Sequence, residues 1–235
     1  MNNTILIAIF QEHCDKCWYR DILKLIKDEK NCKFCYQVNR DISILLSRIE
    51  GARRSIDIGI SLPNSSKLNE YLPYEKAGFI LFTHTGNDLN KRILTILDKA
   101  FESNYENVIL ISHSTPDLPP LYIKKAIEKL HNGKKLVFGP LSNGGLYLVG
   151  MNKSFYFNNR RKNIFRIINF KTRKLAIIIS MFLRKHYLSF FFLPKWHQLK
   201  RIPDFKRLSH KLYRENIAWN ATWTRQIINK YIGLK

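Results

Sequence analysis

The first 150 residues alternate between short apolar runs and segments whose apolar residues recur at helical spacing. Apolar or alternating runs predict strands at residues 5–10, 55–62, 78–82, 108–111, 135–138 and 146–149. Apolar positions three and four apart predict helices at 38–50, 88–101 and 119–130, the last with a proline in its first turn. Strands that alternate with helices are typical of an α/β domain with a largely parallel sheet.

The pattern changes beyond residue 150. An apolar run at 175–183 is followed by Arg184 and Lys185, and residues 190–193 predict one more strand. Residues 205–232 end in a predicted helix that carries Trp219 and Trp223. This part of the chain therefore continues the fold, but with a more basic and aromatic composition.

Charge is distributed unevenly along the 235 residues, whose formal net charge is +22. Residues 151–235 hold 20 Lys and Arg against two acidic residues, whereas residues 1–150 hold 20 against 16. Such a basic segment attracts an anionic partner, which can be an acidic lipid surface, a nucleic acid or a phosphorylated substrate. We expect an α/β domain over residues 1–205 and a basic C-terminal helix over 206–235, packed on that domain or extending from it.

Hydrophobic residues make up 45% of the chain, which is typical of a folded protein rather than a disordered one. No run reaches 18 uncharged apolar residues, so the sequence predicts no transmembrane span. The first residues lack the basic region and cleavage site of a signal peptide, and they are interpreted as a first strand. The sequence therefore predicts a cytoplasmic protein.

Two loops that carry polar residues directly follow predicted strands. The segment ISHSTPDLP follows the strand at 108–111, and GPLSNGG follows the strand at 135–138. Ligands of parallel sheets bind at the carboxyl ends of strands. Paired glycines also allow a close backbone approach or a positive φ. We therefore expect a binding site at these two loops.

Three sequence blocks occur in a fixed order, with a predicted helix between one block and the next. They are GNDLNKRI (86–93), VILISHSTPDL (108–118) and VFGPLSNGGLYLVG (137–150). In these blocks the chain resembles a group of small bacterial GT-A-like glycosyltransferases, whose typical motifs read G-x-DLGERM, VVLIGSDCPDL and GPA-x-DGGYYLIG. The resemblance covers residues 78–150, and more weakly 5–10 and 190–205. It implies a three-layer α/β/α domain with a mixed, mostly parallel sheet and a pocket for a nucleotide-sugar donor, to which the charge pattern adds a basic C-terminal helical extension.

The positions that carry metal-binding acids in that family hold other residues here. Ser114 stands in place of the acid before C-P-D-L, and Asn143 in place of the acid before Gly-Gly. Gln198 and Lys200 match the C-terminal D-x-D pattern. In GT-A enzymes a carboxylate pair holds a divalent cation that bridges the nucleotide diphosphate. The replacements therefore favour a site without a divalent cation.

Two functions remain open. In the first, the protein is a metal-independent glycosyltransferase of cell-envelope or polysaccharide glycosylation, and Lys200, Arg201 or Arg20 contacts the donor phosphates. In the second, activity is lost, and the fold is a binding scaffold for a membrane surface or a nucleic acid. No residue is an evident general base, which weakens the first hypothesis. Between the anionic partners, the resemblance favours the inner face of the membrane, because transferases with lipid-linked acceptors need that contact.

The candidate donor-binding residues come from the matched blocks and from the basic segments. They are Arg20, Asp88, Arg92, His113, Ser114, Asp117, Asn143, Gly144, Gly145, Lys200 and Arg201. Asp88 and Asp117 also fit roles in helix capping and loop structure. His113 follows a strand end, where it fits either a substrate hydrogen bond or a capping role.

The four cysteines form two pairs, Cys14-x-x-Cys17 and Cys32-x-x-Cys35, separated by 14 residues. Two such pairs are a familiar tetrathiolate zinc pattern, because each pair can occupy one edge of a tetrahedron. A structural zinc ion would fix the loop that borders the nucleotide in the resembling family. A redox pair, an iron–sulfur site and ordinary buried thiols are the alternatives.

Overall fold

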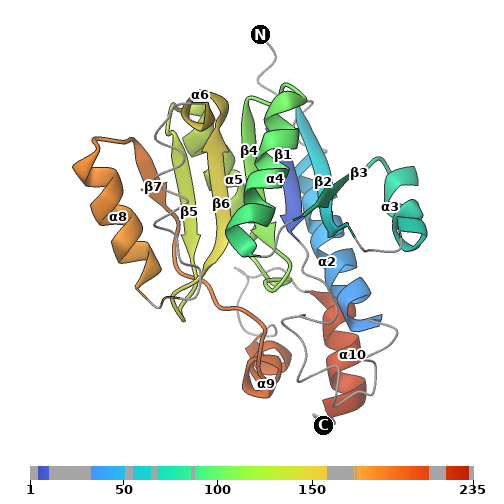
Figure 1. Cartoon of the computed structure of the whole chain (residues 1–235). Coiled ribbons are helices and arrows are strands. Elements are labelled where there is room, and N and C mark those ends of the chain that lie inside the picture. The colour runs from blue at the N-terminus through green and yellow to red at the C-terminus, as the bar shows by residue number, and fades with distance from the viewer. Residues whose placement is uncertain are drawn as a thin grey trace.

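The computed structural model describes residues 5–10, 33–50, 55–64, 68–85, 88–157, 172, 174–211 and 221–232 (Figure 1). Its described strands form one seven-stranded sheet in the order β3-β2-β1-β4-β6-β5-β7. The strands are β1 (Ile5–Phe10), β2 (Ile56–Pro63), β3 (Ile80–His84), β4 (Asn107–Ser112), β5 (Leu136–Pro140), β6 (Leu146–Asn152) and β7 (Phe190–Phe192). Strand β6 runs antiparallel to β4 and β5, and the other pairs are parallel. The expected mixed, mostly parallel sheet is confirmed.

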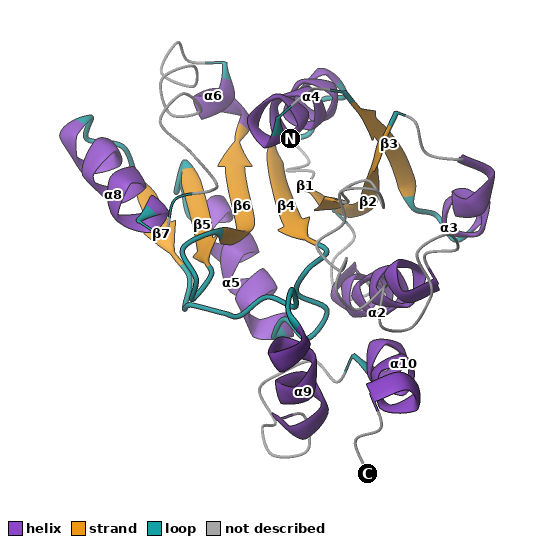
Figure 2. Cartoon of the chain, turned by 60° about the horizontal axis from the view of Figure 1, so that its bottom comes forward, coloured by secondary structure: helices purple, strands orange, loops and turns teal. Residues whose placement is uncertain are grey.

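Helices cover both faces of the sheet and complete a three-layer α/β/α arrangement (Figure 2). One layer contains α2 (Lys33–Glu50), α5 (Pro120–His131), α9 (Ile202–Lys211) and α10 (Thr222–Ile232). The other layer contains α4 (Leu89–Glu102), α6 (Lys153–Tyr156) and α8 (Leu175–Lys185). A short 3-10 helix (Leu68–Tyr71) and α3 (Leu72–Lys76) precede β3.

Strand β1 lies inside the sheet and is buried on both of its faces. Its side chains alternate: Ile5, Ile7 and Ile9 belong to the core under α2 and α5, and Leu6 and Ala8 belong to the core under α4. A strand covered on both faces needs an unbroken apolar sequence, which is why this run was recognisable from the sequence. The sheet thus divides the interior into two hydrophobic cores.

Two of the element boundaries that differ from the sequence expectation have a clear cause. Helix α2 begins at Lys33, five residues before the expected start at 38, and its first turns are buried through Phe34 and Val38. Strand β3 spans Ile80–His84 instead of 78–82, because a turn with Gly78 at a φ of +89° occupies the expected strand start. The N-cap expected at Asp88 is confirmed, since its side chain accepts a hydrogen bond of 2.8 Å from the Lys91 amide.

The C-terminal segment is anchored to the domain by a buried carboxylate. Asp41 of α2 accepts hydrogen bonds from the amides of Trp223 and Thr224, at 3.2 and 2.7 Å, and from the Thr224 hydroxyl at 2.7 Å. The Arg40 guanidinium lies 3.6 Å from the centre of the Trp223 ring. Burial raises the pKa of Asp41, while the Thr224 hydrogen bonds oppose that shift. Asp41 therefore caps the first turn of α10, a helix that is distant in sequence. The expected domain boundary at residue 205 stays a prediction.

His84 lies buried at the carboxyl end of β3, stacked on Phe10 with ring centroids 5.1 Å apart. Its Nδ1 is 2.7 Å from the Ser61 hydroxyl. Burial lowers the pKa of this imidazole to about 4, and the nearby positive charges of Arg92 and Lys99 lower it further in the same direction. The folded protein therefore keeps His84 neutral at pH values where the unfolded chain protonates it.

We predict that His84 makes the protein less stable as the pH falls. Between pH 6.5 and about 4 the unfolded chain binds a proton that the folded chain does not, so the free energy of unfolding decreases by up to about 3 kcal/mol. The His84→Asn variant keeps a partner for Ser61 but cannot titrate. Urea unfolding across this pH range should give a shallower slope for the variant than for the wild type, and equal slopes would contradict the assignment.

Candidate functional site

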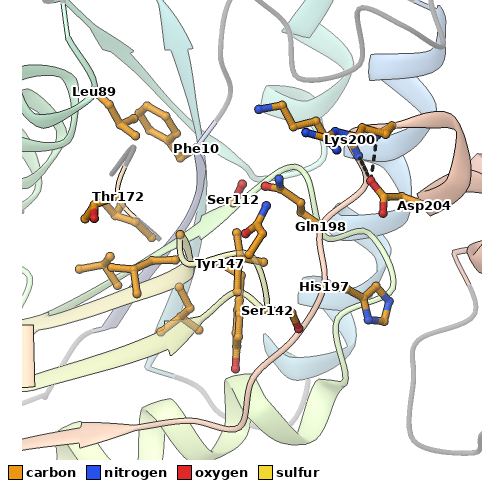
Figure 3. A pocket seen from close by; sticks show the side chains of 18 of the residues that line it. Phe10, Leu89, Ser112, Ser142, Tyr147, Thr172, His197, Gln198, Lys200 and Asp204 are labelled. Carbon is orange, nitrogen blue, oxygen red and sulfur yellow. Dashed lines mark hydrogen bonds between the residues drawn. The ribbon is translucent and has the colours of Figure 1, made fainter. Parts of the chain in front are cut away.

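A cleft of about 700 Å³ opens at the carboxyl ends of β1 and β4. Figure 3 shows Phe10 and Leu89 on one side of it, with Ser112, Gln198 and Lys200 opposite them. Most of the remaining described lining comes from the loop between β5 and β6, from β6 itself, and from the start of α9. The cleft is therefore located where the sequence predicted a site.

The loop between β5 and β6 forms one wall of the cleft. It turns tightly, because the Gly144 amide donates to the Leu141 carbonyl at 3.0 Å and the Leu141 amide donates to the Gly145 carbonyl at 2.8 Å. Gly144 adopts a φ of +104°, a conformation that other residues rarely take. Asn143 and Gly145 line the cleft, so the stretch is both a hairpin connection and a wall of the site.

A second wall is the extended segment 193–201, which arrives from β7. The Trp196 amide donates to the Pro140 carbonyl at 3.0 Å, and the Leu199 amide donates to the Ser114 carbonyl at 2.8 Å. The segment thus bridges the two strand-end loops that the sequence singled out. This path brings Gln198 and Lys200 to the cleft, although they are far from those loops in sequence.

Asp117 holds this segment in place. Its carboxylate is buried and accepts hydrogen bonds from Trp196 Nε1 at 3.3 Å and from His197 Nε2 at 2.7 Å. It does not cap α5, whose N-cap is Pro119, so the capping role that the sequence suggested for Asp117 is wrong, whereas its contacts fit the suggested role in loop structure. Asp117 is also outside the lining of the cleft, and its contacts are those of an anchor between two loops.

Basic side chains gather at the first turns of α9. Asp204 accepts hydrogen bonds from the amides of Lys200 and Arg201, at 3.1 and 2.8 Å, as the third helical residue does in a capping box. Arg207 Nη2 lies 3.7 Å from the same carboxylate. Within the described residues, Arg207 Nε and Nη2 are buried and make no hydrogen bond. Lys200, Arg201 and Arg207 all line the cleft, so this end of it is positively charged.

The described residues of the cleft do not fit the divalent cation of the resembling family. Asp204 is the acidic residue among the described lining, and two amides and an arginine already surround it. Ser112, Asn143 and Gln198 offer neutral oxygens beside cationic side chains. Across the described parts of the chain, no three His, Cys, Asp or Glu side chains gather to share a metal ion. The charges here suit an anion rather than a hard cation.

Of the candidate residues, the structure brings Asn143, Gly145, Lys200 and Arg201 together at the cleft. Gly144 shapes the loop without lining the cleft, and Asp88 caps α4. Arg92 lies on α4 outside the lining. Arg20 falls outside the described residues.

Ser114 and His113 lie buried behind the cleft rather than in it. The Ser114 hydroxyl is 2.8 Å from the hydroxyl of Ser112, which does line the cleft. His113 Nδ1 is 3.1 Å from the Phe10 carbonyl, so this ring joins β4 to β1. Both residues therefore support the strand ends, and of these three residues Ser112 is the one that lines the cleft.

The sequence did not identify Arg207 as a residue of the site. A helical pair of opposite charges at positions 204 and 207 was visible, but such a pair is usually only a surface contact. The position of Arg207 in the cleft depends on the tertiary path of segment 193–201, which no local pattern encodes.

The structure describes one of the four cysteines of the predicted zinc site. Cys35 is buried in the first turns of α2, within the core of that layer. Cys14, Cys17 and Cys32 fall outside the described residues. The tetrathiolate site stays a prediction, which metal analysis of the purified protein can test.

Comparison with known proteins supports the fold. A family model described as "Uncharacterized protein conserved in bacteria (DUF2064)" matches residues 62–172. No curated protein matches the chain. A solved structure from Desulfovibrio desulfuricans G20, provisionally described as a nucleotide-diphospho-sugar transferase, is similar with a TM-score of 0.75 and 21% identity over 97% of both chains.

Two further solved structures are similar at lower identity. A 4-diphosphocytidyl-2C-methyl-D-erythritol synthase from Anaerococcus prevotii DSM 20548 has a TM-score of 0.57 at 12% identity, over 86% of this chain and 93% of its own. A cytidylyltransferase from Leptospira borgpetersenii serovar Hardjo-bovis has a TM-score of 0.52 at 13% identity, over 99% and 96%. At these identities the likeness shows the fold, and it confirms the GT-A-like α/β architecture expected from the sequence.

We predict that the two neighbouring glycines of the loop respond differently to alanine. Gly144→Ala forces a side chain into the positive-φ region and should lower the free energy of unfolding by about 1–2 kcal/mol. At Gly145 a Cβ would lie 3.2 Å from Leu141 Cδ1, the end of a flexible side chain, so Gly145→Ala should cost less than about 1 kcal/mol. Urea unfolding of both variants checks this order, and equal losses would contradict the loop geometry.

Proposed function

We propose that the cleft binds the diphosphate of a nucleotide-sugar donor, and that the protein is a glycosyltransferase whose basic residues replace the usual divalent cation. One observation carries the proposal. Lys200, Arg201 and Arg207 converge on the cleft at the carboxyl ends of β1 and β4, and the acid beside them, Asp204, is already engaged.

The size and lining of the cleft suit such a donor. Its volume of about 700 Å³ falls within the range of small-molecule sites. Phe10, Leu89 and Ile93 offer apolar surface for a base or a sugar ring, while Ser112 and Gln198 offer hydrogen bonds. Charge-assisted hydrogen bonds from the basic side chains would hold the phosphates and stabilise the charge of the leaving diphosphate.

The comparisons supply indirect support. The structure from Desulfovibrio desulfuricans G20 carries a provisional description as a nucleotide-diphospho-sugar transferase, and the likeness extends over nearly the whole of both chains. The three sequence blocks at 86–93, 108–118 and 137–150 resemble bacterial GT-A-like glycosyltransferases. We therefore also propose that the protein transfers the sugar to an acceptor in cell-envelope or polysaccharide glycosylation.

A binding scaffold without transferase activity is the second candidate, and one observation favours it. Asp204, the acidic residue of the described lining, already accepts two amide hydrogen bonds and is therefore not an evident general base. The transferase binds and turns over a nucleotide sugar, whereas the scaffold binds an anionic membrane surface or a nucleic acid. Slow release of nucleoside diphosphate from a bound nucleotide sugar supports the transferase, and binding of an anionic partner without any such release supports the scaffold.

We predict that Arg207 contributes to binding of the diphosphate. Calorimetric titration with UDP, GDP, CDP and TDP in the presence of a chelator should show binding of at least one. Arg207→Gln should weaken that binding at least about 10-fold, because a charge-assisted hydrogen bond is lost. Lys195→Gln is the matched control, since Lys195 is exposed and lies on segment 193–201 without lining the cleft.

The titration contradicts the proposal if no nucleotide binds, or if both variants bind as tightly as the wild type. Thermal unfolding of each variant shows whether a loss of binding reflects a loss of folding, because Arg207 also pairs with Asp204.

A further inference from the structure

Helix α8 has two apolar faces, and one of them is exposed. Leu175, Ile179 and Leu183 are buried against the sheet. On the outward side, Ile177 is 59% exposed and Met181 is 66% exposed. Isolated apolar residues on a surface are ordinary, but these two are four positions apart and therefore form a continuous stripe.

Basic residues border this stripe. At 100° per residue, Arg184 lies on one side of Ile177 and Met181, and Lys174 and Lys185 lie on the other. All three basic side chains are exposed. The outer face of α8 is thus an apolar centre between positive borders, the pattern of a helix that lies in the interface of an anionic bilayer.

An independent feature stands at the end of the same helix. Tyr187 follows α8 with a φ of 53°, a conformation in which helix ends usually place glycine. Its amide donates to the Arg184 carbonyl at 3.0 Å, so the residue closes the helix. The side chain is 97% exposed, so the strained backbone presents a whole aromatic ring to the solvent. A tyrosine ring with its polar tip suits the boundary between water and lipid.

The charge of the sequence that flanks α8 indicates the kind of partner. The 75 residues from 129 to 203 contain 16 Lys and Arg and no Asp or Glu. A second copy of this chain would bring the same positive charge against α8, and a nucleic acid would leave Ile177 and Met181 without apolar contacts. We propose that the outer face of α8, formed by Lys174, Ile177, Met181, Arg184, Lys185 and Tyr187, docks the protein on an anionic phospholipid surface.

This surface differs from the basic C-terminal helix that the sequence predicts over residues 206–235. In α10, Trp223 is half-buried beneath Arg40, and Trp219 falls outside the described residues. No helix among the described residues has the length and hydrophobicity to cross a bilayer. With 11 residues, α8 is about 16 Å long, so it would lie along the membrane surface. The inference is independent of the proposed nucleotide binding.

Co-sedimentation of the full chain with vesicles tests the proposal. Vesicles of phosphatidylcholine with phosphatidylglycerol should bind the protein, and vesicles of phosphatidylcholine alone should bind it far more weakly. The variant Lys174→Gln/Arg184→Gln/Lys185→Gln should lower partitioning about 100-fold. The variant Ile177→Ser/Met181→Ser/Tyr187→Ser should lower it about 10-fold.

The matched control is Leu121→Ser/Lys124→Gln on α5, where an apolar side chain that is 63% exposed lies near an exposed lysine in the other helix layer. This control should bind vesicles as the wild type does. Circular dichroism establishes that each variant is folded. Hydrogen exchange of the wild type should show protection of residues 174–187 on anionic vesicles.

Several results would overturn the proposal: no binding to phosphatidylglycerol vesicles, equal binding by all variants, or protection confined to other segments. Self-association, or binding to duplex DNA, that the apolar variant abolishes would reassign the face to a second copy or to nucleic acid.

Discussion

The buried carboxylate of Asp117 connects the two halves of the cleft. It accepts hydrogen bonds from Trp196 and His197, and so it fixes the extended segment 193–201 over the loop that follows β4. The positions of the basic side chains in the cleft depend on the path of this segment, because Lys200 and Arg201 lie on it and α9 begins where it ends. A buried acid that loses its partners is costly, so the two loops hold each other in one arrangement. The residue that organises the site thus lies outside its lining.

The same geometry explains how Lys200 can stand where the resembling family has an acid. Asp204 accepts the amides of Lys200 and Arg201 and lies 3.7 Å from Arg207, which orients the first turns of α9 toward the cleft. A carboxylate surrounded by donors is a poor metal ligand but a good organiser of positive charge. On this account, the chain binds a diphosphate with fixed side-chain cations instead of an exchangeable ion.

Local patterns predicted the elements better than the site. The unbroken apolar run of β1 and the cap at Asp88 were recognisable because their causes are local. The start of β3 was misplaced because the turn at Gly78 precedes it, and a positive φ leaves no hydrophobic pattern. The partners of Asp117 and the position of Arg207 could not be predicted for a different reason. Both depend on the route of segment 193–201, which is a property of the packed fold.

The central claim is that side-chain cations take the place of a divalent metal at the diphosphate. The most direct measurement is the dissociation constant of a bound nucleoside diphosphate for the wild-type protein, first with a chelator and then with Mn²⁺ in excess. Because Mn²⁺ neutralises part of the phosphate charge, the account predicts that binding is unchanged or weaker with the metal. Binding that appears only with Mn²⁺, or tightens about 10-fold or more, would contradict it.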